Sequence, residues 1–177
     1  MSRKLHIGGK VRADGWEVVN ALPGPYVDHV CNANDFSRFD SNTFSAIYAS
    51  HVVEHFDYRG ELQKTLKEWL RVLEPGGKLY ISVPDLDILA KLLLAKNELT
   101  VKERFEVMCM IFGGHMDKYD YHLTGLNEDF MTIILKNIGY VNILRVNEFG
   151  LFDDTSCWRF KGVAISLNMS AEKPAAD

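Results

Sequence analysis

The sequence predicts a single α/β domain built around a largely parallel β-sheet, and three observations lead to this fold class. Short apolar runs of strand type alternate along the chain with runs that have helical spacing. Glycine, proline and asparagine mark many of the connections between them. The length of 177 residues is that of one domain with a substantial core. Because strands separated by helices need crossover connections, neighbouring strands are expected to be parallel.

Seven short runs, rich in β-branched, aromatic and other apolar residues, are expected to form the strands. They cover residues 4–7, 16–19, 26–30, 45–50, 78–83, 140–146 and 161–167. The last residues, 170–177, have the composition of a disordered tail. The domain is therefore expected to span residues 1–169.

Residues 59–74 have the pattern of an amphipathic helix, with apolar residues on one face and charged residues on the other. The apolar face consists of Leu62, Leu66, Trp69, Leu70 and Leu73. Pro75, Gly76 and Gly77 then stop the helix and turn the chain directly into the next strand.

A second amphipathic helix is expected over residues 128–138. Asn127 is a suitable N-cap, and Gly139 is a suitable residue to end the helix. The inward face is expected to carry Phe130, Ile133, Ile134 and Ile138. A further helix is expected to begin after Asp85, whose carboxylate is better explained as a helix cap than as part of a metal site.

Charge and cysteine content exclude several classes of protein. A net charge of −4 gives no electrostatic reason to expect nucleic acid or an anionic membrane as partner. The three cysteines are far apart and lack Cys-x-x-Cys spacing, which favours reduced thiols in a cytoplasmic setting and no zinc site. No apolar run has the length of a signal-peptide core at the N-terminus or of a membrane span elsewhere.

Polar residues or glycine follow each of the first five predicted strands. They are Gly8, Gly9 and Lys10, then Asn20, then Asn32 to Asp35, then His51, Glu54 and His55, and finally Asp85. Ligands of open parallel sheets bind beyond the carboxyl ends of the strands. One extended ligand explains five such strand ends better than five separate turns, although a glycine pair alone is equally typical of a plain turn.

The stretch "HVVEH" followed by "EPGGKLYISVP" makes the sequence resemble a known family. Residues 4–168 resemble the class I S-adenosylmethionine-dependent methyltransferases, in particular the Methyltransferase-11-like group often found with sugar and polysaccharide biosynthesis. The resemblance implies a Rossmann-like sheet of seven strands in the order 3-2-1-4-5-7-6, with helices on both faces and the last-numbered strand antiparallel. It also implies S-adenosylmethionine as the cofactor.

The resemblance implies a set of cofactor-binding residues. They are Gly8, Gly9, Lys10, Asn20, Asn32, Ala33, Ala49, Ser50 and His51. Three of them depart from the family pattern: Lys10 replaces a glycine, and Asn20 and Asn32 stand where acids are usual. An amide keeps an acceptor oxygen but loses the charge assistance that makes a hydrogen bond roughly twice as strong. Weak cofactor binding is therefore expected.

Histidines are the candidate catalytic residues, because a hydroxyl acceptor must lose a proton near neutral pH. His122, with Asp120 close by, is the preferred base, and an ordinary surface histidine is the alternative reading. His51 and His55 flank the expected methyl site, where they can orient the substrate or brace the structure. Residues 97–127 are expected to form a lid, unless a second copy or another partner chain covers the cofactor.

The most favoured function is O-methylation of a sugar or another small molecule. The alternative is a methyltransferase-fold protein that has lost catalysis and serves as a binding or accessory subunit, which the three departures support. A nicotinamide-dependent oxidoreductase is disfavoured, because no G-x-G-x-x-G follows the first strand. Nucleic-acid substrates are disfavoured, because "VPD" stands where nucleobase methyltransferases have Asn-Pro-Pro-aromatic.

Overall fold

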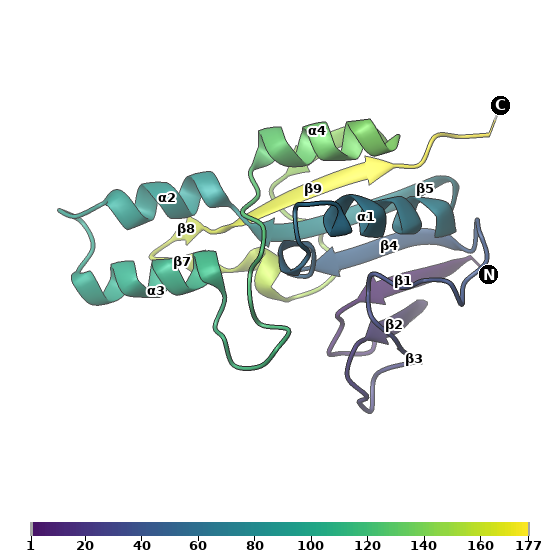
Figure 1. Ribbon diagram of the computed structural model, residues 1–177, viewed down its shortest axis with the longest axis horizontal. Helices are drawn as coiled ribbons and strands as arrows, with labels where there is room; N and C mark the ends of the chain where they lie inside the picture. The colour runs from purple at the N-terminus through teal and green to yellow at the C-terminus, as the bar shows by residue number, and fades with distance from the viewer. Residues whose placement is uncertain (1, 177) are drawn as a thin grey trace.

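The computed structural model describes residues 2–176, and its centre is a seven-stranded sheet (Figure 1). The strands of this sheet are β1 Arg3–Ile7, β2 Trp16–Asn20, β3 His29–Val30, β4 Phe44–Ser50, β5 Leu73–Pro84, β6 Val141–Val146 and β9 Ser166–Glu172. The helices are α1 Glu61–Val72, α2 Leu86–Leu94, α3 Val101–Phe112 and α4 Glu128–Ile138, with 3-10 turns η1 Val53–His55 and η2 Thr155–Cys157. A separate hairpin is formed by β7 Arg159–Phe160 and β8 Val163–Ala164.

The strand order is β3-β2-β1-β4-β5-β9-β6, which confirms the expected Rossmann-like arrangement with β9 in the place of the seventh strand. β1 to β5 pair in parallel, and β9 runs antiparallel to both β5 and β6. The carboxyl ends of the parallel strands therefore meet at one edge. α2 and α3 project beyond this edge as a helical arm, around a small core of Leu89, Val107 and Ile165 (Figure 1).

α1 forms where the apolar spacing predicted a helix. Leu62, Leu66 and Trp69 are fully buried, because residues three and four apart lie on one face of a helix. The Trp69 indole Nε1 also donates a hydrogen bond of 2.8 Å to the carbonyl of Ala33. The first helix thus supports the loop that follows β3.

α4 has the expected ends, and its inward face is confirmed in part, because Ile134 and Ile138 pack against the core as expected. The Asn127 side chain accepts from the backbone N–H of Phe130 at 2.9 Å, and Gly139 ends the helix with φ of 112°. Phe130 and Ile133, expected inside, are 50% and 57% exposed. Met131 and Leu135 are buried in their place. A helix rich in apolar residues has more than one candidate stripe, and its contacts with α1, β6 and β9 select among them.

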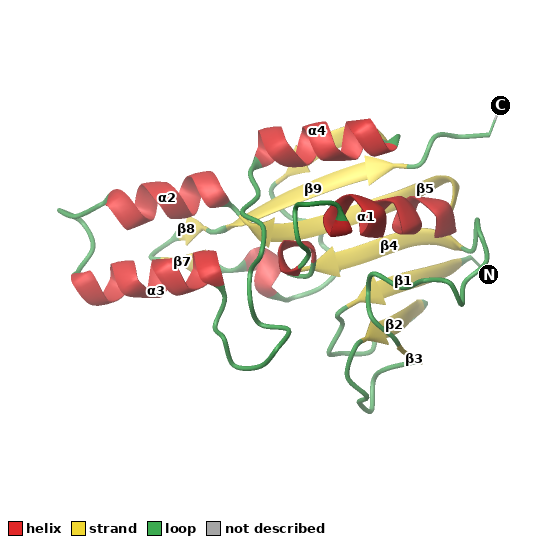
Figure 2. Cartoon of the chain, viewed as in Figure 1, coloured by secondary structure: helices red, strands yellow, loops and turns green. Residues whose placement is uncertain are grey.

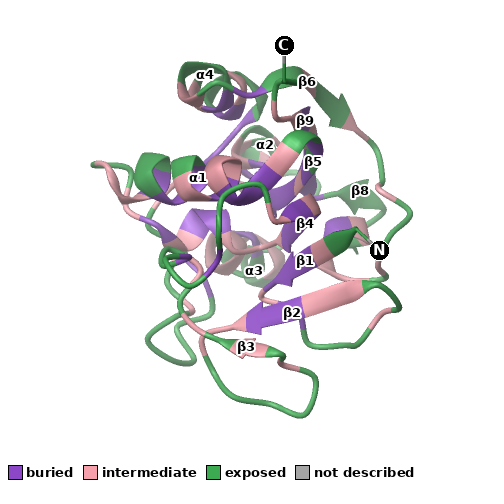
Figure 3. Ribbon diagram, turned by 90° about the vertical axis from the view of Figure 1, so that its right-hand side faces the viewer, coloured by how far each residue is buried: buried purple, intermediate pink, exposed green. Residues whose placement is uncertain are grey.

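Helices cover one face of the sheet, not both as expected. α1 and α4 contact each other and lie on the same side (Figure 3). The connections that follow β1, β2 and β3 contain no α-helix within residues 2–176 (Figure 2). The opposite face is covered by the segment 147–158, whose Phe152 packs on His6 and Tyr48 with ring centroids 4.2 and 4.6 Å apart. Short connections leave no room for helices there, and aromatic side chains exclude water instead.

The chain remains in the sheet beyond the expected domain end at residue 169. β9 continues to Glu172 and pairs with β5 along its whole length, so the first residues of the expected tail 170–177 are ordered. Leu167, Met169 and Ala171 are buried at a spacing of two, which is typical of a strand. The run 161–167 expected to form this strand contributes instead to β8 and only to the start of β9.

Three further features bear on the sequence predictions. Within residues 2–176 no helix combines the length and apolar character that a membrane crossing requires. Cys31, Cys109 and Cys157 are all free thiols, in agreement with their spacing in the sequence. Asp85 caps α2 as expected, since its carboxylate accepts from the backbone N–H groups of Asp87 and Ile88.

We predict that His6 makes the fold sensitive to acid. His6 is 5% exposed, and burial lowers its pKa to about 4, so the folded protein holds the neutral ring. Its contribution to stability is present above its ordinary pKa of 6.5 and is lost as the pH falls towards 4. Chemical unfolding at a series of pH values should show that His6→Phe loses less unfolding free energy than the wild type as the pH falls. This variant keeps an aromatic ring against Phe152. Equal slopes for the two proteins would contradict this account.

Candidate active site

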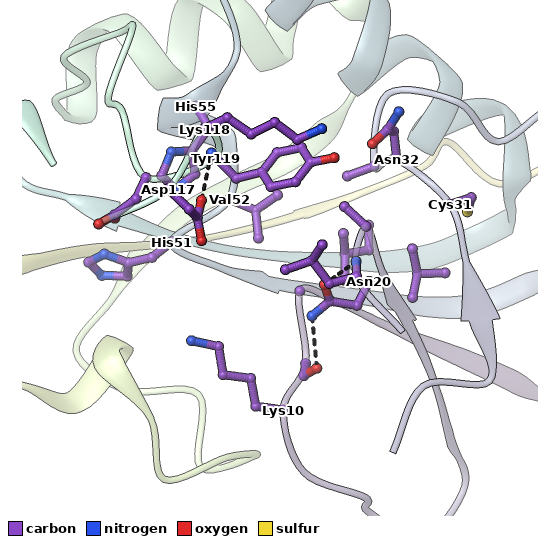
Figure 4. Close-up of a pocket in the computed structure, with 18 of the residues that line it drawn as sticks. Lys10, Asn20, Cys31, Asn32, His51, Val52, His55, Asp117, Lys118 and Tyr119 are labelled. Atoms are coloured by element: carbon purple, nitrogen blue, oxygen red, sulfur yellow. Dashed lines mark hydrogen bonds between the residues drawn. The ribbon is translucent and has the colours of Figure 1, made fainter. Parts of the chain in front are cut away.

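The carboxyl edge of the sheet holds a cavity of about 1160 Å³ (Figure 4). Its walls come from the ends of β1, β2, β3 and β4, and from the loop 116–123 that follows α3. These segments are distant in sequence and meet because parallel strands end at the same edge. The cavity therefore lies where the sequence predicted an extended ligand.

The turn after β1 leaves backbone exposed to this cavity. Gly8 has φ of 76°, and a Cβ added there would lie 2.8 Å from Val52 Cγ2. A Cβ on Gly9 would lie 2.8 Å from the His6 ring. Both glycines are thus required for close packing, and only glycine adopts the Gly8 conformation without strain. The glycine pair therefore forms a tight turn, and this turn also lines the cavity.

Asn20 and Lys10 lie on the same side of the cavity (Figure 4). The Asn20 amide donates to the carbonyl of Gly9 at 3.3 Å, and its oxygen accepts from the backbone N–H of Leu22 at 3.0 Å. The amide therefore braces two loops, while its oxygen retains a second lone pair. Lys10 is exposed at the cavity rim.

The loop after β3 supplies one expected residue pair and one that the sequence reasoning missed. Asn32 is exposed and Ala33 is half-buried, and both line the cavity. Beside them the Asn34 amide donates to Glu61 Oε1 at 2.8 Å. Glu61 places a carboxylate in the cavity wall near Asn32, although it belongs to the first turn of α1. Only the fold brings that turn to the loop after β3.

Ala49 and Ser50 do not line the cavity, in contrast to the prediction. Ala49 is fully buried in the core. The Ser50 hydroxyl donates to Asp154 Oδ1 at 3.2 Å, on the face of the sheet covered by the segment 147–158. Alternation along β4 directs these two side chains to opposite faces, and neither face opens into the cavity.

Three histidines surround one buried carboxylate at the end of the cavity nearest β4. Glu54 is 1% exposed, and neither carboxylate oxygen has a hydrogen-bond partner within the described chain. His51 Nδ1 lies 3.3 Å and His122 Nε2 lies 4.0 Å from Glu54 Oε1. The rings of His55 and His122 are 5.0 Å apart. The structure thus brings together the three histidines that the sequence singled out, around Glu54.

Burial sets the protonation states in this cluster. Removal from water raises the pKa of Glu54 to about 8, so the carboxyl is neutral at pH 7. Burial and the nearby His122 lower the pKa of His51 to about 4. Burial and the nearby His55 lower the pKa of His122. A cluster of neutral, water-shielded groups at neutral pH is characteristic of a functional site.

Hydrogen bonds to backbone carbonyls fix two of the imidazole rings. His55 Nδ1 lies 3.0 Å from the carbonyl of Tyr121, and His122 Nδ1 lies 3.3 Å from the carbonyl of Ile111. A carbonyl only accepts, so each Nδ1 carries the proton of the neutral ring and each Nε2 carries a free lone pair. The same loop is tied to η1, because Leu123 and Thr124 both donate to the Glu54 carbonyl.

Residues 16–81 match the family model described as "Methyltransferase domain". A methyltransferase of Archaeoglobus fulgidus, described as SAM-dependent, has a TM-score of 0.61 at 12% identity, over 97% of this chain and 86% of its own. Phosphoethanolamine N-methyltransferase 2 of Haemonchus contortus has a TM-score of 0.57 at 16% identity, over 98% of this chain and 49% of its own. No curated protein matches the sequence.

The fold and the position of the cavity define the class I methyltransferase architecture. The predicted resemblance to that class is confirmed by the match to residues 16–81 and by the solved structures. The CurJ carbon methyltransferase has a TM-score of 0.57 at 15% identity, and the match covers 98% of this chain and 49% of that protein. The chain therefore spans about half the length of several proteins that it resembles.

We predict that Glu54 destabilises the fold as the pH rises. Because the folded pKa is raised from 4.5 to about 8, the group contributes fully below pH 4.5 and this contribution is lost towards pH 8. Glu54→Gln keeps the shape and removes the ionisation. In the presence of a chelator, the wild type should lose unfolding free energy relative to the variant as the pH rises from 4.5 to about 8. Unfolding curves that stay parallel over this range would disprove the assignment.

Proposed function

We propose that the protein is an S-adenosylmethionine-dependent methyltransferase that methylates a hydroxyl group of a sugar or another small molecule. The observation that carries the proposal is one continuous cavity that reaches from the Gly8 turn to the histidine cluster. A ligand site and a site for proton removal are needed side by side for this reaction. At about 1160 Å³ the cavity is slightly larger than the ~300–1,000 Å³ of most pockets that bind small molecules.

The cavity wall fits the proposed cofactor. The Gly8 turn is a cradle that a Cβ would fill, and it lets a ligand approach the backbone. The free lone pair of Asn20 and the polar side chains of Asn32 and Glu61 offer partners for ribose and adenine groups. When bound, S-adenosylmethionine supplies a methyl group on a positively charged sulfur, which is already activated for transfer. The protein needs only to align the acceptor and to manage its proton.

The histidine cluster is the proposed site for the acceptor hydroxyl. His51, His55 and His122 all line the cavity, and the Nε2 lone pairs of His55 and His122 are free to accept. The loop 116–123 forms the wall of this end of the cavity. The expected lid over residues 97–127 is thus proposed to act through its second half.

The alternative function is a binding or accessory subunit without catalysis. It is supported by Lys10 at the cavity rim and by Asn20, whose amide is already occupied by backbone groups. The carboxylate of Glu61, which accepts hydrogen bonds from Asn34 and from the backbone N–H of Asp57, favours the enzyme, because it restores an acid to the wall that Asn32 leaves without one. Ligand binding and turnover separate these functions in the following experiments.

We predict that S-adenosylhomocysteine raises the melting temperature of the protein. At a hundredfold excess over the dissociation constant, binding stabilises the folded state by about 2.7 kcal/mol. For a chain of this size, each kcal/mol corresponds to about 2–4 °C in the melting temperature. NADH serves as the control, since it contains adenosine and ribose but belongs to the disfavoured oxidoreductase class.

Hydrogen exchange in the same titration tests the loop. Residues 116–123 should become more protected when the ligand is bound, because they line the cavity. No melting shift at saturating S-adenosylhomocysteine would refute the proposed cofactor. A shift without a change in exchange would refute closure of the loop only.

We predict that His122→Ala lowers turnover by ~10²-fold or more while binding of S-adenosylhomocysteine is nearly unchanged. His122 lies at the end of the cavity away from the Gly8 turn, so its loss affects the acceptor side. Turnover is measured as S-adenosylhomocysteine released with a panel of sugars. His29→Ala is the control, because His29 lies on β3 paired with Glu17 and outside the cavity wall. Normal turnover in His122→Ala would exclude this residue from the reaction.

A further inference from the structure

Glu54, His55 and His122 form a three-residue cluster whose ligand atoms all lie within 4.8 Å of one another. We propose that this cluster binds a divalent transition-metal ion, and that the ion holds the acceptor hydroxyl of the proposed reaction. The spacing in the sequence does not predict a metal site here, because three helices and a strand separate His122 from the other two residues. The fold alone assembles the three ligands.

The Glu54 carboxylate lacks the partners that a buried acid normally has. It is buried, and both oxygens lack a hydrogen-bond partner within the described chain. His51 Nδ1 lies 3.3 Å away, but without the alignment of a hydrogen bond. A buried carboxylate is costly unless it is paired or coordinates a metal. Asp85, which is equally buried, shows the usual solution: it receives backbone N–H groups and lies 2.8 Å from Arg145 Nη2.

The orientation of the two imidazoles also fits a metal site. Metal-binding histidines almost always donate the other ring N–H to a carbonyl, carboxylate or water, which fixes the ring and its tautomer. His55 and His122 both do so through Nδ1, to the carbonyls of Tyr121 and Ile111. The remaining nitrogen of each ring, Nε2, is then free to bind a metal. The outer contacts of a metal site are therefore already present.

The donor set selects the kind of metal. Two imidazoles and one carboxylate, with a position left open, are the ligands of catalytic zinc in several enzymes. Imidazole favours zinc and neighbouring transition metals over magnesium or calcium. Zinc bonds of ~2.0–2.2 Å place tetrahedral ligands ~3.3–3.5 Å apart. The 4.0 Å between His122 Nε2 and Glu54 Oε1 is within a small side-chain movement of that spacing.

A metal ion held by these residues would be reached from the cavity, because His55 and His122 both line it, while Glu54 lies outside its wall. A hydroxyl bound to a divalent ion ionises more readily than a free one. Its O–H bond breaks, the electron pair remains on the oxygen, and the proton passes to solvent. This role rests on the proposed function, and it makes His55 and His122 metal ligands in place of the base and orienting residue that the sequence predicted.

Metal titration of the full chain tests the site directly. Protein stripped with a chelator is titrated calorimetrically with zinc chloride, and one ion per chain is expected to bind. Glu54→Gln, His55→Ala and His122→Ala should each weaken binding by at least ~10-fold, the smaller effect seen even for outer contacts of metal sites. His29→Ala should bind as the wild type does. Equal affinity in all five proteins would show that zinc binds elsewhere, and the proposal would be wrong.

Cobalt absorption spectra of the wild type supply a test that does not depend on the folding of any variant. Visible bands of Co²⁺ with nitrogen and oxygen ligands are expected. Thiolate charge-transfer bands, which would indicate Cys31, Cys109 or Cys157 as ligands, or no bands at all, would overturn the proposal. The melting shift with S-adenosylhomocysteine, measured without metal, is independent. A melting shift without metal binding would disprove only the metal site. Metal binding without a melting shift would disprove only the proposed cofactor.

Discussion

Parallel pairing of β4 with both β1 and β5 is the constraint on which the rest of the structure depends. It buries the centre of β4 completely and sends the carboxyl ends of all neighbouring strands to one edge. The turn at Gly8 can then approach Val52 closely, since both follow paired strands. Every wall of the cavity is attached to this edge, so the position of the site follows from the direction of the strands.

The one-sided cover of helices gives the two faces of the sheet different chemistry. The face beneath α1 and α4 is an apolar core of aliphatic and aromatic side chains, Trp69 among them, whereas the other face is closed by aromatic rings together with hydrogen bonds to the segment 147–158. The Tyr48 hydroxyl donates to Asp154 Oδ2 at 2.9 Å, and Asn168 donates to the carbonyls of Asn147 and Ser156. Strand side chains with polar ends can anchor an irregular segment, because its backbone needs hydrogen-bond partners.

The histidine cluster contains a buried group, the Glu54 carboxyl, that is electrostatically unfavourable. Glu54 is buried without a hydrogen-bonded partner, and its carboxyl stays neutral at pH 7 for that reason. Such a group weakens a fold unless it has another use. Its own backbone carbonyl is well bonded, to the N–H groups of Leu123 and Thr124. These backbone hydrogen bonds hold the loop that carries His122 beside the Glu54 carboxyl group. They help to offset the cost of burying that group.

Local patterns in the sequence determined the elements that depend on neighbouring residues: the buried face of α1, the Asn127 cap, the turn at Gly8 and Gly9, and the motif that placed His51 and His55 after β4. The tertiary structure decided what depends on distant partners. It rotated α4 so that Met131 and not Phe130 is inside, extended β9 to Glu172 by pairing it with β5, and directed Ser50 away from the cavity. It also joined Glu54 to His122. The physical reason is that propensity, capping and periodicity act within a few residues, whereas strand pairing, helix packing and the burial of a charge are set by groups that meet only in the folded chain.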